Sequence, residues 1–274
     1  MDSYTDAPPV DRDLLDLAVA LAGRAGRFAR ERFFAGPGPV TRKADGSEVT
    51  AADVAVEELI REELGRHAPG DEVYGEERGT TPGTTGRRWV IDPIDGTYYF
   101  TRRIPLFTTT LAVEDEHGPA VGIVYHPVAE QMVHAGRGRG CWRAALAAEP
   151  ARVSTRTRLR GARTGMGNPG TWSSELVETL HRTVFLTNIG DTVGVATGQV
   201  EAMVVAGAPM GYEDLAPLPV IVREAGGRVT DLAGDPLLSG NGTILATNGV
   251  LHDEYLALVA GLEHGRDWRT LAHG

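Results

Sequence analysis

The chain has 274 residues, of which 42% are hydrophobic and 23% are charged, and its formal net charge is −10 at pH 7. A chain of this length and composition can bury a core as an ordinary globular protein. Its negative charge argues against a general nucleic-acid binder, because affinity for the phosphate backbone comes largely from Lys and Arg.

Cysteine usage and the chain start exclude further classes. The single cysteine, Cys141, permits neither an intramolecular disulfide nor a thiolate zinc cluster. Residues 1–10 lack the positive and apolar segments of a signal peptide, and no apolar run is long enough to cross a bilayer. We therefore expect a cytoplasmic protein with no nucleic-acid and no membrane partner.

Two helices are predicted near the start of the chain. Apolar residues recur at helical spacing over residues 11–34, and the segment Gly36-Pro37-Gly38-Pro39 ends that helix. The second helix is expected over residues 51–64, with Thr50 or Ser47 as its N-cap.

Strands are predicted next. After a Gly/Thr-rich loop expected over residues 79–86, the apolar residues 89–91 predict a buried strand. Alternating apolar patterns then predict antiparallel strands over residues 107–114, 120–126 and 131–135.

The Arg-rich stretch 152–163 is the expected boundary between an N-terminal α+β half, residues 1–150, and a C-terminal α/β half, residues 151–274, packed as one compact unit. The second half is predicted to contain helices over residues 173–181, 192–197, 214–224 and 252–261, and strands over residues 183–186, 201–205 and 244–247. This mixture of elements indicates the α+β class.

The most informative segment is Asp92-Pro93-Ile94-Asp95-Gly96-Thr97, which follows the apolar strand directly. Pro and Gly force the backbone to turn, so both carboxylates are presented at the end of a strand. Two acids this close repel one another unless a cation or a proton lies between them, and hard divalent metals prefer oxygen ligands. The segment therefore predicts a metal site.

Two more acidic elements lie elsewhere in the chain. Gly75-Glu76-Glu77 precedes the turn, and Glu213-Asp214 follows it, ahead of an apolar run and Glu224-Ala225-Gly226-Gly227. Each acidic pair alone is weak, since most acids are solvated surface. In order and approximate spacing, however, the set resembles the signatures of the inositol monophosphatase family of magnesium-dependent phosphatases. The resemblance runs from about Lys43 to Asn248.

The resemblance implies a layered α-β-α-β-α sandwich and hydrolysis of a phosphate monoester with two or three Mg²⁺ ions. Carried over residue by residue, Glu76, Asp92 and the Ile94 carbonyl would hold the first metal. Asp92, Asp95 and Asp214 would hold the second, with Asp92 bridging the two. Glu76 is also expected among the catalytic groups.

The resemblance also implies how water and phosphate are held. Thr97 would hydrogen-bond the attacking water and would itself be paired with Asp53. The backbone N–H groups of Gly96 and Thr97 would bind the phosphate. Plainer interpretations stay open at this point: Asp53 as a solvated charge in a first helical turn, Asp214 as a helix N-terminal acid, and Thr97 as a cap.

The chain departs from the family pattern in three places, and these concern the substrate and the second metal. Tyr99 stands where the family commonly has Asn, and Glu213 where it usually has Trp. Residues 202–212 contain no acid, although inositol-type members use one there to hold sugar hydroxyls. Gly190-Asp191 is similar to the histidinol-phosphate phosphatase branch, so Asp191 is expected to bind substrate with Asp95, by hydrogen-bonding a cationic amine, or else to cap a helix.

The leading expectation is a magnesium-dependent phosphomonoesterase for a small phosphorylated polyol or amino alcohol: inositol monophosphate, histidinol phosphate, or a sugar or nucleoside phosphate of a specialised pathway. The first alternative is a 3′(2′),5′-bisphosphate nucleotidase or fructose-1,6-bisphosphatase, with Arg102, Arg103 and Arg163 binding a second phosphate. The second is a non-catalytic metal or sugar-phosphate binding protein, if Glu213 and Tyr99 have disabled the site. Members of the family often form homodimers, so a homodimer is the expected assembly.

Overall fold

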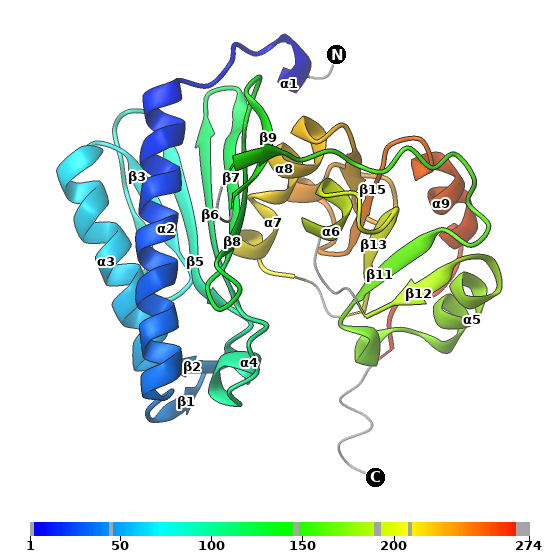
Figure 1. The fold of residues 1–274 in the computed structure, drawn as a ribbon, viewed down its shortest axis with the longest axis horizontal. Helices are drawn as coiled ribbons and strands as arrows, with labels where there is room; N and C mark the ends of the chain where they lie inside the picture. The colour runs from blue at the N-terminus through cyan, green and yellow to red at the C-terminus, as the bar shows by residue number, and fades with distance from the viewer. Residues whose placement is uncertain (1–2, 44–45, 145–147, 189–192, 208–209, 267–274) are drawn as a thin grey trace. The chain divides into compact units, whose positions relative to one another are not determined.

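A computed structural model of the protein describes residues 3–43, 46–144, 148–188, 193–207 and 210–266 (Figure 1). The chain divides into two compact units, Met1–Glu149 and Pro150–Gly274. Each unit has a hydrophobic core of its own. Among the described residues, no helix combines the length and the apolar character that a bilayer crossing needs.

Two long helices of the first unit follow the predicted pattern. After the short α1 (Ser3–Asp6), helix α2 spans Arg12–Ala35 and α3 spans Ala51–His67. The expected N-cap of α3 is confirmed as Thr50, whose hydroxyl accepts the Ala52 N–H at 3.1 Å. Both predicted helices are confirmed, and α3 continues beyond residue 64.

The sheets of the first unit contain more strands than the sequence predicted. A hairpin pairs β1 (Val40–Arg42) with β2 (Glu48–Thr50). The main sheet has eight strands in the order β10-β9-β8-β7-β6-β5-β3-β4. Their bounds are β3 Glu72–Gly75, β4 Gly79–Thr81, β5 Arg88–Asp95, β6 Thr108–Asp115, β7 Gly118–His126, β8 Gln131–Gly136, β9 Gly140–Ala144 and β10 Ala148–Pro150.

Two sequence predictions for this sheet need correction. Part of the loop expected over residues 79–86 is strand β4, because Gly79–Thr81 pairs with β3 at the edge of the sheet. The strand expected over residues 89–91 continues through both acids to Asp95, since the ladder with β6 resumes after a bulge. The strands predicted over residues 107–114, 120–126 and 131–135 are confirmed as β6, β7 and β8.

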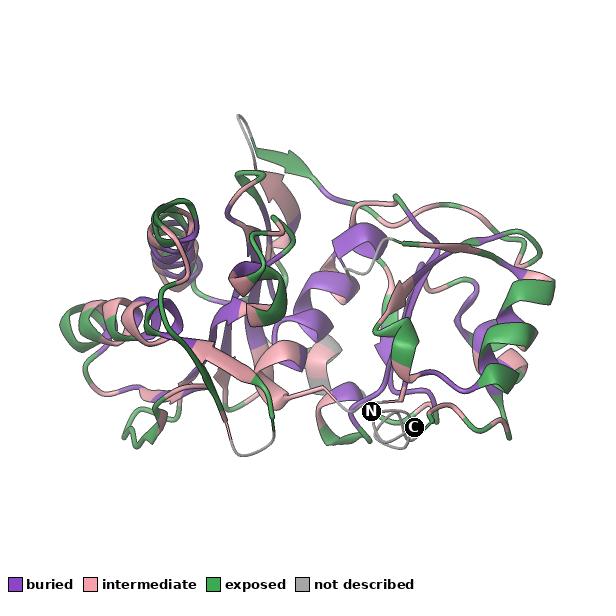
Figure 2. Cartoon of the chain, turned by 90° about the horizontal axis from the view of Figure 1, so that it is seen from below, coloured by how far each residue is buried: buried purple, intermediate pink, exposed green. Residues whose placement is uncertain are grey.

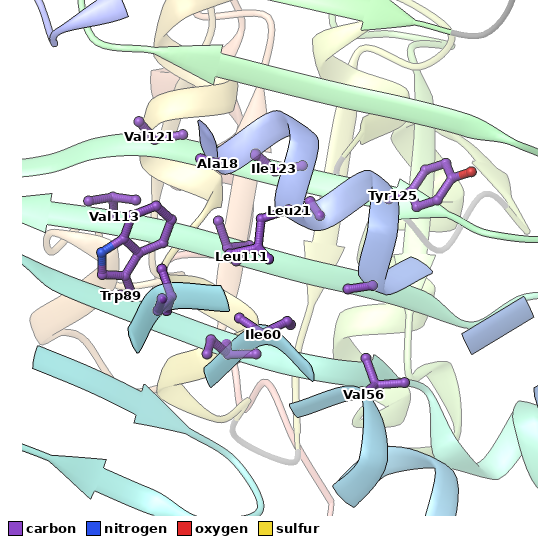
Figure 3. Packing of buried hydrophobic residues seen from close by; sticks show 14 of the residues in the cluster. Ala18, Leu21, Val56, Ile60, Trp89, Leu111, Val113, Val121, Ile123 and Tyr125 are labelled. Carbon is purple, nitrogen blue, oxygen red and sulfur yellow. The ribbon is translucent and has the colours of Figure 1, made fainter. Parts of the chain in front are cut away.

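Helices α2 and α3 pack on one face of the main sheet, and their outward sides are exposed (Figure 2). In the core, Ala18 and Leu21 of α2 lie against Leu111 and Ile123 of the sheet (Figure 3). Burial of such aliphatic side chains contributes about 1.5–3 kcal/mol for each large residue. Both helices also contact β5, the strand that ends at Asp95.

The second unit is built on a five-stranded sheet in the order β12-β11-β13-β15-β14. Its strands are β11 Arg163–Gly167, β12 Phe185–Thr187, β13 Ala202–Val205, β14 Arg228–Thr230 and β15 Ile244–Thr247. Residues of β13 alternate between two clusters: Ala202 and Val204 join one, while Met203 and Val205 join the other. The sheet is therefore covered on both faces.

The helices of the second unit are α5 Ser174–Thr183, α6 Val193–Ala196, α7 Tyr212–Leu215, α8 Leu218–Glu224 and α9 His252–Val259, with two short 3₁₀ turns, Pro169–Thr171 and Leu237–Ser239. The single helix predicted over residues 214–224 is wrong. Pro217 separates α7 from α8, because a proline has no N–H to continue the helical ladder and fits instead at a helix start.

Helices pack against mixed sheets in both units, which confirms the α+β class. The first unit supplies a helix layer and a sheet, and the second supplies a sheet between two helix layers. Strands β11 and β14 escaped prediction, since each is short and neither has a clear alternation of apolar and polar residues.

Candidate active site

The acidic turn is built on a β-bulge at the end of β5. The ladder with β6 pairs Asp92 with Thr110 and Asp95 with Thr108, so two residues of β5 face one residue of β6. The Thr109 hydroxyl donates to the Pro93 carbonyl at 2.9 Å and holds the bulge in place. Bulges re-aim side chains, and this one brings carboxylate oxygens of Asp92 and Asp95 within 4.8 Å of each other.

Both carboxylates are held by neighbouring donors. Asp92 is buried, and its Oδ1 accepts the backbone N–H of Ile94 at 3.0 Å. Asp95 is half-buried, and its Oδ2 accepts the Thr108 hydroxyl at 3.0 Å. Two adjacent acids presenting hard oxygen donors at this separation suit a divalent cation, which would relieve their mutual repulsion.

Asp53 and Thr97 are brought together from segments far apart in the sequence. The Thr97 hydroxyl donates toward Asp53 Oδ1 at 3.1 Å, with the Ile94 carbonyl at 3.2 Å as a second acceptor. Asp53 Oδ2 accepts the N–H and the hydroxyl of Thr50 at 2.8 and 2.6 Å. Burial raises the pKa of Asp53, while the hydrogen bonds from Thr50 and Thr97 oppose that rise.

The plainer interpretation of Asp53 as a solvated charge is wrong, because its side chain is completely buried. It does complete the capping box of α3 with Thr50. Thr97 is the first residue of α4 (Thr97–Thr101), and the N-cap of that helix is Gly96. Gly96 has φ +88°, a left-handed conformation that favours glycine, and so the turn into α4 requires it.

The Glu76-Glu77 turn lies beside the acidic strand end. The backbone N–H of Glu76 donates to the Ile91 carbonyl at 3.2 Å, one residue before Asp92. The Lys43 ammonium donates to Glu76 Oε1 at 2.7 Å and to Glu77 Oε1 at 2.8 Å. Burial raises the pKa of Glu77 to about 7, even though the Lys43 hydrogen bond opposes the rise.

Two residues of this site were not predicted from the sequence, Lys43 and Glu57. Lys43 directly follows β1, and a lysine in such a position is normally expected to be exposed to solvent. Glu57 lies on α3 and is completely buried, although the neighbouring acids of that helix made it resemble a solvated face. The spacing from Asp53 to Glu57, four residues on one helix, was the available signal.

Of the remaining predicted residues, two lie in α7 of the second unit, two fall outside the described residues and one lies in the first unit. Asp214 is half-buried in α7, and its Oδ2 accepts the Gly211 N–H at 3.0 Å, so it does act as a helix N-terminal acid. Glu213, its neighbour, is also half-buried. Gly190 and Asp191 lie outside the described residues. Tyr99, in the first unit, is 38% exposed.

The arginines expected to bind a second phosphate are engaged elsewhere. Arg102 pairs with Glu48 at 2.8 Å and stacks over a tyrosine ring. Arg103 donates to the carbonyls of Phe33 and Phe34. Arg163 donates to Glu201 Oε1 at 2.7 Å.

A sequence model of the inositol monophosphatase family matches residues 11–264. The chain therefore belongs to the inositol monophosphatase family. It is a phosphatase, a hydrolase of phosphoric monoesters.

Among its relatives, a histidinol-phosphatase of Mycobacterium tuberculosis is 38% identical to this chain, and the alignment includes 90% of this chain and 98% of the relative. An inositol-1-monophosphatase of Mesorhizobium japonicum is 30% identical, with 96% of it and 90% of this chain aligned. The solved structure of the extragenic suppressor protein suhB of Bartonella henselae superposes with a TM-score of 0.82 at 27% identity, covering 91% of this chain and all of that one. An IMPase of Thermotoga maritima gives a TM-score of 0.80 at 26% identity, covering 90% of this chain and 96% of that one.

Proposed function

We propose that the protein is a Mg²⁺-dependent phosphomonoesterase in which water attacks the phosphate of a small phosphorylated amino alcohol or polyol. The observation that carries this proposal is the bulge at the end of β5, which brings carboxylate oxygens of Asp92 and Asp95 within 4.8 Å of each other. At this turn Asp92 accepts a backbone N–H and Asp95 accepts a hydroxyl.

The residues that would hold the metals are those carried over from the family pattern. Glu76, Asp92 and the Ile94 carbonyl would hold one ion, and Asp92, Asp95 and Asp214 another. The hydrogen bond from the Glu76 N–H to the Ile91 carbonyl supports this assignment, because Ile91 directly precedes Asp92. When bound, such ions neutralise phosphate charge and lower the pKa of water.

Asp53 and Thr97 would hold the attacking water. A Thr hydroxyl has one proton, and here that proton points to Asp53 Oδ1 or to the Ile94 carbonyl. The lone pairs of Thr97 Oγ1 are then available to accept a hydrogen bond from water and to orient it. Asp53, buried with a raised pKa, would take up the hydroxyl proton as the water loses its own.

For the substrate we favour histidinol phosphate, with inositol monophosphate as the competitor. Three relatives of 33–38% identity are histidinol-phosphatases, whereas the inositol-1-monophosphatases are 30% identical. The absence of an acid from residues 202–212 in the sequence removes a group suited to sugar hydroxyls. Asp191 would hydrogen-bond the substrate's cationic amine, with Asp95 also facing the substrate. Arg102 is hydrogen-bonded to Glu48 and Arg103 to the Phe33 carbonyl, which disfavours a bisphosphate substrate.

The test is phosphate release from histidinol phosphate, inositol monophosphate, fructose 1,6-bisphosphate and adenosine 3′,5′-bisphosphate, each with Mg²⁺ and with EDTA. We expect metal-dependent turnover with the highest kcat/KM for histidinol phosphate. Asp191→Asn should lower the ratio of kcat/KM for histidinol phosphate over inositol monophosphate about tenfold or more, since a charged hydrogen bond is worth about 1.5–3 kcal/mol. Asp13→Asn, an exposed acid of α2, is the control and should leave the ratio unchanged. An unchanged ratio in Asp191→Asn would contradict the amine contact, and an inactive wild-type protein would contradict the whole proposal.

A further inference from the structure

Helix α3 carries a second buried acid that has no part in the proposed chemistry. Glu57 is completely buried, one helical turn after Asp53. Its carboxylate accepts three N–H donors: Arg61 Nε at 2.7 Å, the backbone N–H of Glu77 at 2.8 Å and the backbone N–H of Arg78 at 3.1 Å. The last two belong to the turn that contains Glu76.

The contact between Glu57 and this turn is close on every side. A Cβ on Gly75 would lie 2.3 Å from Glu57 Oε1, so a larger residue there would displace the carboxylate. Arg61, paired with Glu57 at 2.7 Å, reaches on to the Thr81 hydroxyl at 2.9 Å and also donates to the Gly79 carbonyl. Together, Glu57 and Arg61 bind the second half of the turn and the strand that follows it.

The turn is also held from the opposite side, by strand β5. Glu76 donates its N–H to the Ile91 carbonyl at 3.2 Å, while the next two N–H groups go to Glu57. The backbone on either side of the Glu76 side chain is thereby fixed to two different elements. Such supporting hydrogen bonds orient a metal ligand and commonly matter 10–100-fold for metal affinity.

We propose that Glu57 is a positioning residue for the metal site: it fixes the backbone of the Glu76-Glu77 turn and so directs the Glu76 carboxylate toward the ion. This inference rests on the proposed function, since it assumes that Glu76 is a metal ligand. On this account α3 sets both parts of the site, holding Thr97 through Asp53 and the Glu76 turn through Glu57.

The test is Glu57→Gln, which keeps the size of the side chain but replaces one acceptor oxygen with an NH₂ donor. In either orientation of the amide, its NH₂ group would face an N–H donor. That donor is the Glu77 N–H in one orientation, and the Arg61 and Arg78 N–H groups in the other. Mn²⁺ binding is measured by calorimetry on the full chain without substrate, and phosphate release is measured across a Mg²⁺ series. We expect Mn²⁺ affinity to fall about tenfold or more, with half-maximal Mg²⁺ rising in parallel and kcat at saturating Mg²⁺ within about threefold of wild type.

The matched control is Glu58→Gln, the same change one residue along α3. Glu58 is exposed and pairs with the Arg78 side chain, not with the backbone of the turn. Its Mn²⁺ affinity should equal that of wild type. Wild-type Mn²⁺ affinity in folded Glu57→Gln, or a loss of kcat that saturating Mg²⁺ does not restore, would overturn the inference.

Gly75→Ala provides a second route that leaves Glu57 chemically intact. The backbone of Gly75 is outside the left-handed region, so Ala is conformationally allowed, but its methyl group would displace the Glu57 carboxylate from the turn. We expect the same weakening of Mn²⁺ binding, and no further loss in the double variant. Unchanged Mn²⁺ affinity in Gly75→Ala would overturn the inference even if Glu57→Gln does not fold. A wild-type protein that binds Mn²⁺ but releases no phosphate would contradict only the proposed function.

Discussion

At the level of single residues, the proposed chemistry depends on a hydroxyl that has no charge of its own. Thr97 bonds to Asp53, and Asp53 in turn accepts two hydrogen bonds from Thr50. A Thr hydroxyl is a weak base alone, so its contribution depends on the buried carboxylate beside it. The hydroxyl, rather than the volume of the side chain, is therefore the feature to test.

Thr97→Val removes the hydroxyl and keeps the shape of the side chain. We expect kcat to fall by about 10²–10⁴-fold, the usual contribution of a positioned proton acceptor. Thr97→Ser keeps the hydroxyl and should stay within about tenfold of wild type, while thermal unfolding of both variants stays close to wild type. Steady-state phosphate release decides between these outcomes, and equal rates for Val and Ser would show that the hydroxyl has no catalytic part.

The sequence predicts which residues lie together most readily where they stand in one short motif, as Asp92, Asp95 and Thr97 do. The contact between Thr97 and Asp53 was expected from the family resemblance, and the structure contains it. Glu57 and Lys43 were not predicted, because the hydrogen bonds that join them to the Glu76-Glu77 turn link residues 20 and 33 positions apart and are recognised only in the folded chain. A lone acid on a helix or a lone lysine near a turn carries no local sign of such contacts.

At the level of secondary-structure elements, helix α2 packs so closely on β7 that one glycine is required. A Cβ on Gly26 would lie 2.0 Å from Cδ1 of Tyr125. Gly65 of α3, by contrast, is exposed and a Cβ there would meet nothing within 4 Å. Substituting the two glycines therefore distinguishes the effect of packing, at Gly26, from the effect of helix propensity, at Gly65.

Gly26→Ala should lower the free energy of unfolding by about 1–3 kcal/mol, the usual cost of overpacking a core. Gly65→Ala should raise it by about 0.5–1 kcal/mol, since Ala is the better helix former and no contact opposes it. Urea unfolding monitored by circular dichroism measures both. A stabilised Gly26→Ala variant would contradict the close contact between α2 and β7.

His252 links α9 to β14 and β15 as a buried, neutral side chain. The Thr230 hydroxyl donates to the Asp231 carbonyl at 2.7 Å, so it accepts the His252 Nε2–H at 3.0 Å, and Nδ1 accepts the Thr247 hydroxyl at 3.0 Å. Burial lowers the pKa of His252 to about 4, with Arg228 adding to the effect. With these contacts, both nitrogens of the neutral ring are satisfied.

Stability should therefore depend on pH through His252. Between about pH 6.5 and about pH 4 the unfolded chain binds a proton at this residue and the folded chain does not. The contribution is intact above pH 6.5 and is lost as the pH falls, at about 1.4 kcal/mol per unit and up to about 3 kcal/mol. His252→Gln should flatten this part of the curve of unfolding free energy against pH, whereas His181→Gln, an exposed residue of α5, should not. Parallel curves for wild type and His252→Gln would contradict the assignment.

Element prediction was most reliable for α2 and α3 and least reliable for short strands. Apolar residues at helical spacing identified α2, because such a pattern reports directly which side of a helix is buried, and a capping residue marked the start of α3. Strands β1, β4 and β14 have three residues each, too few for a period of two to be seen. The order of the eight-stranded sheet, with β3 between β5 and β4, depends on pairing between distant segments that no local pattern records.

At the level of the whole molecule, the net charge is −10, so we expect bound cations to stabilise the folded chain in addition to their proposed role in catalysis. Acids that repel one another in the folded chain gain from a bound ion, and an ion that binds the folded chain alone stabilises it by mass action. At a Mg²⁺ concentration of about 100 times Kd, the free energy of unfolding should rise by about 2.7 kcal/mol.

Thermal or urea unfolding with Mg²⁺, compared with NaCl at equal ionic strength, measures this gain. Asp95→Asn removes a proposed ligand and should abolish most of the Mg²⁺-specific part. If NaCl stabilises as much as Mg²⁺, general screening explains the effect and no specific site is needed.

The proposed function requires that the acids at the end of β5 hold a metal ion. The most direct measurement is phosphate release from histidinol phosphate by wild type and Asp92→Asn, each in Mg²⁺ and in EDTA. We expect turnover by wild type in Mg²⁺ alone, and a loss of at least about 10²-fold in Asp92→Asn with the fold retained. Turnover by Asp92→Asn at the wild-type rate, or by wild type in EDTA, would contradict it.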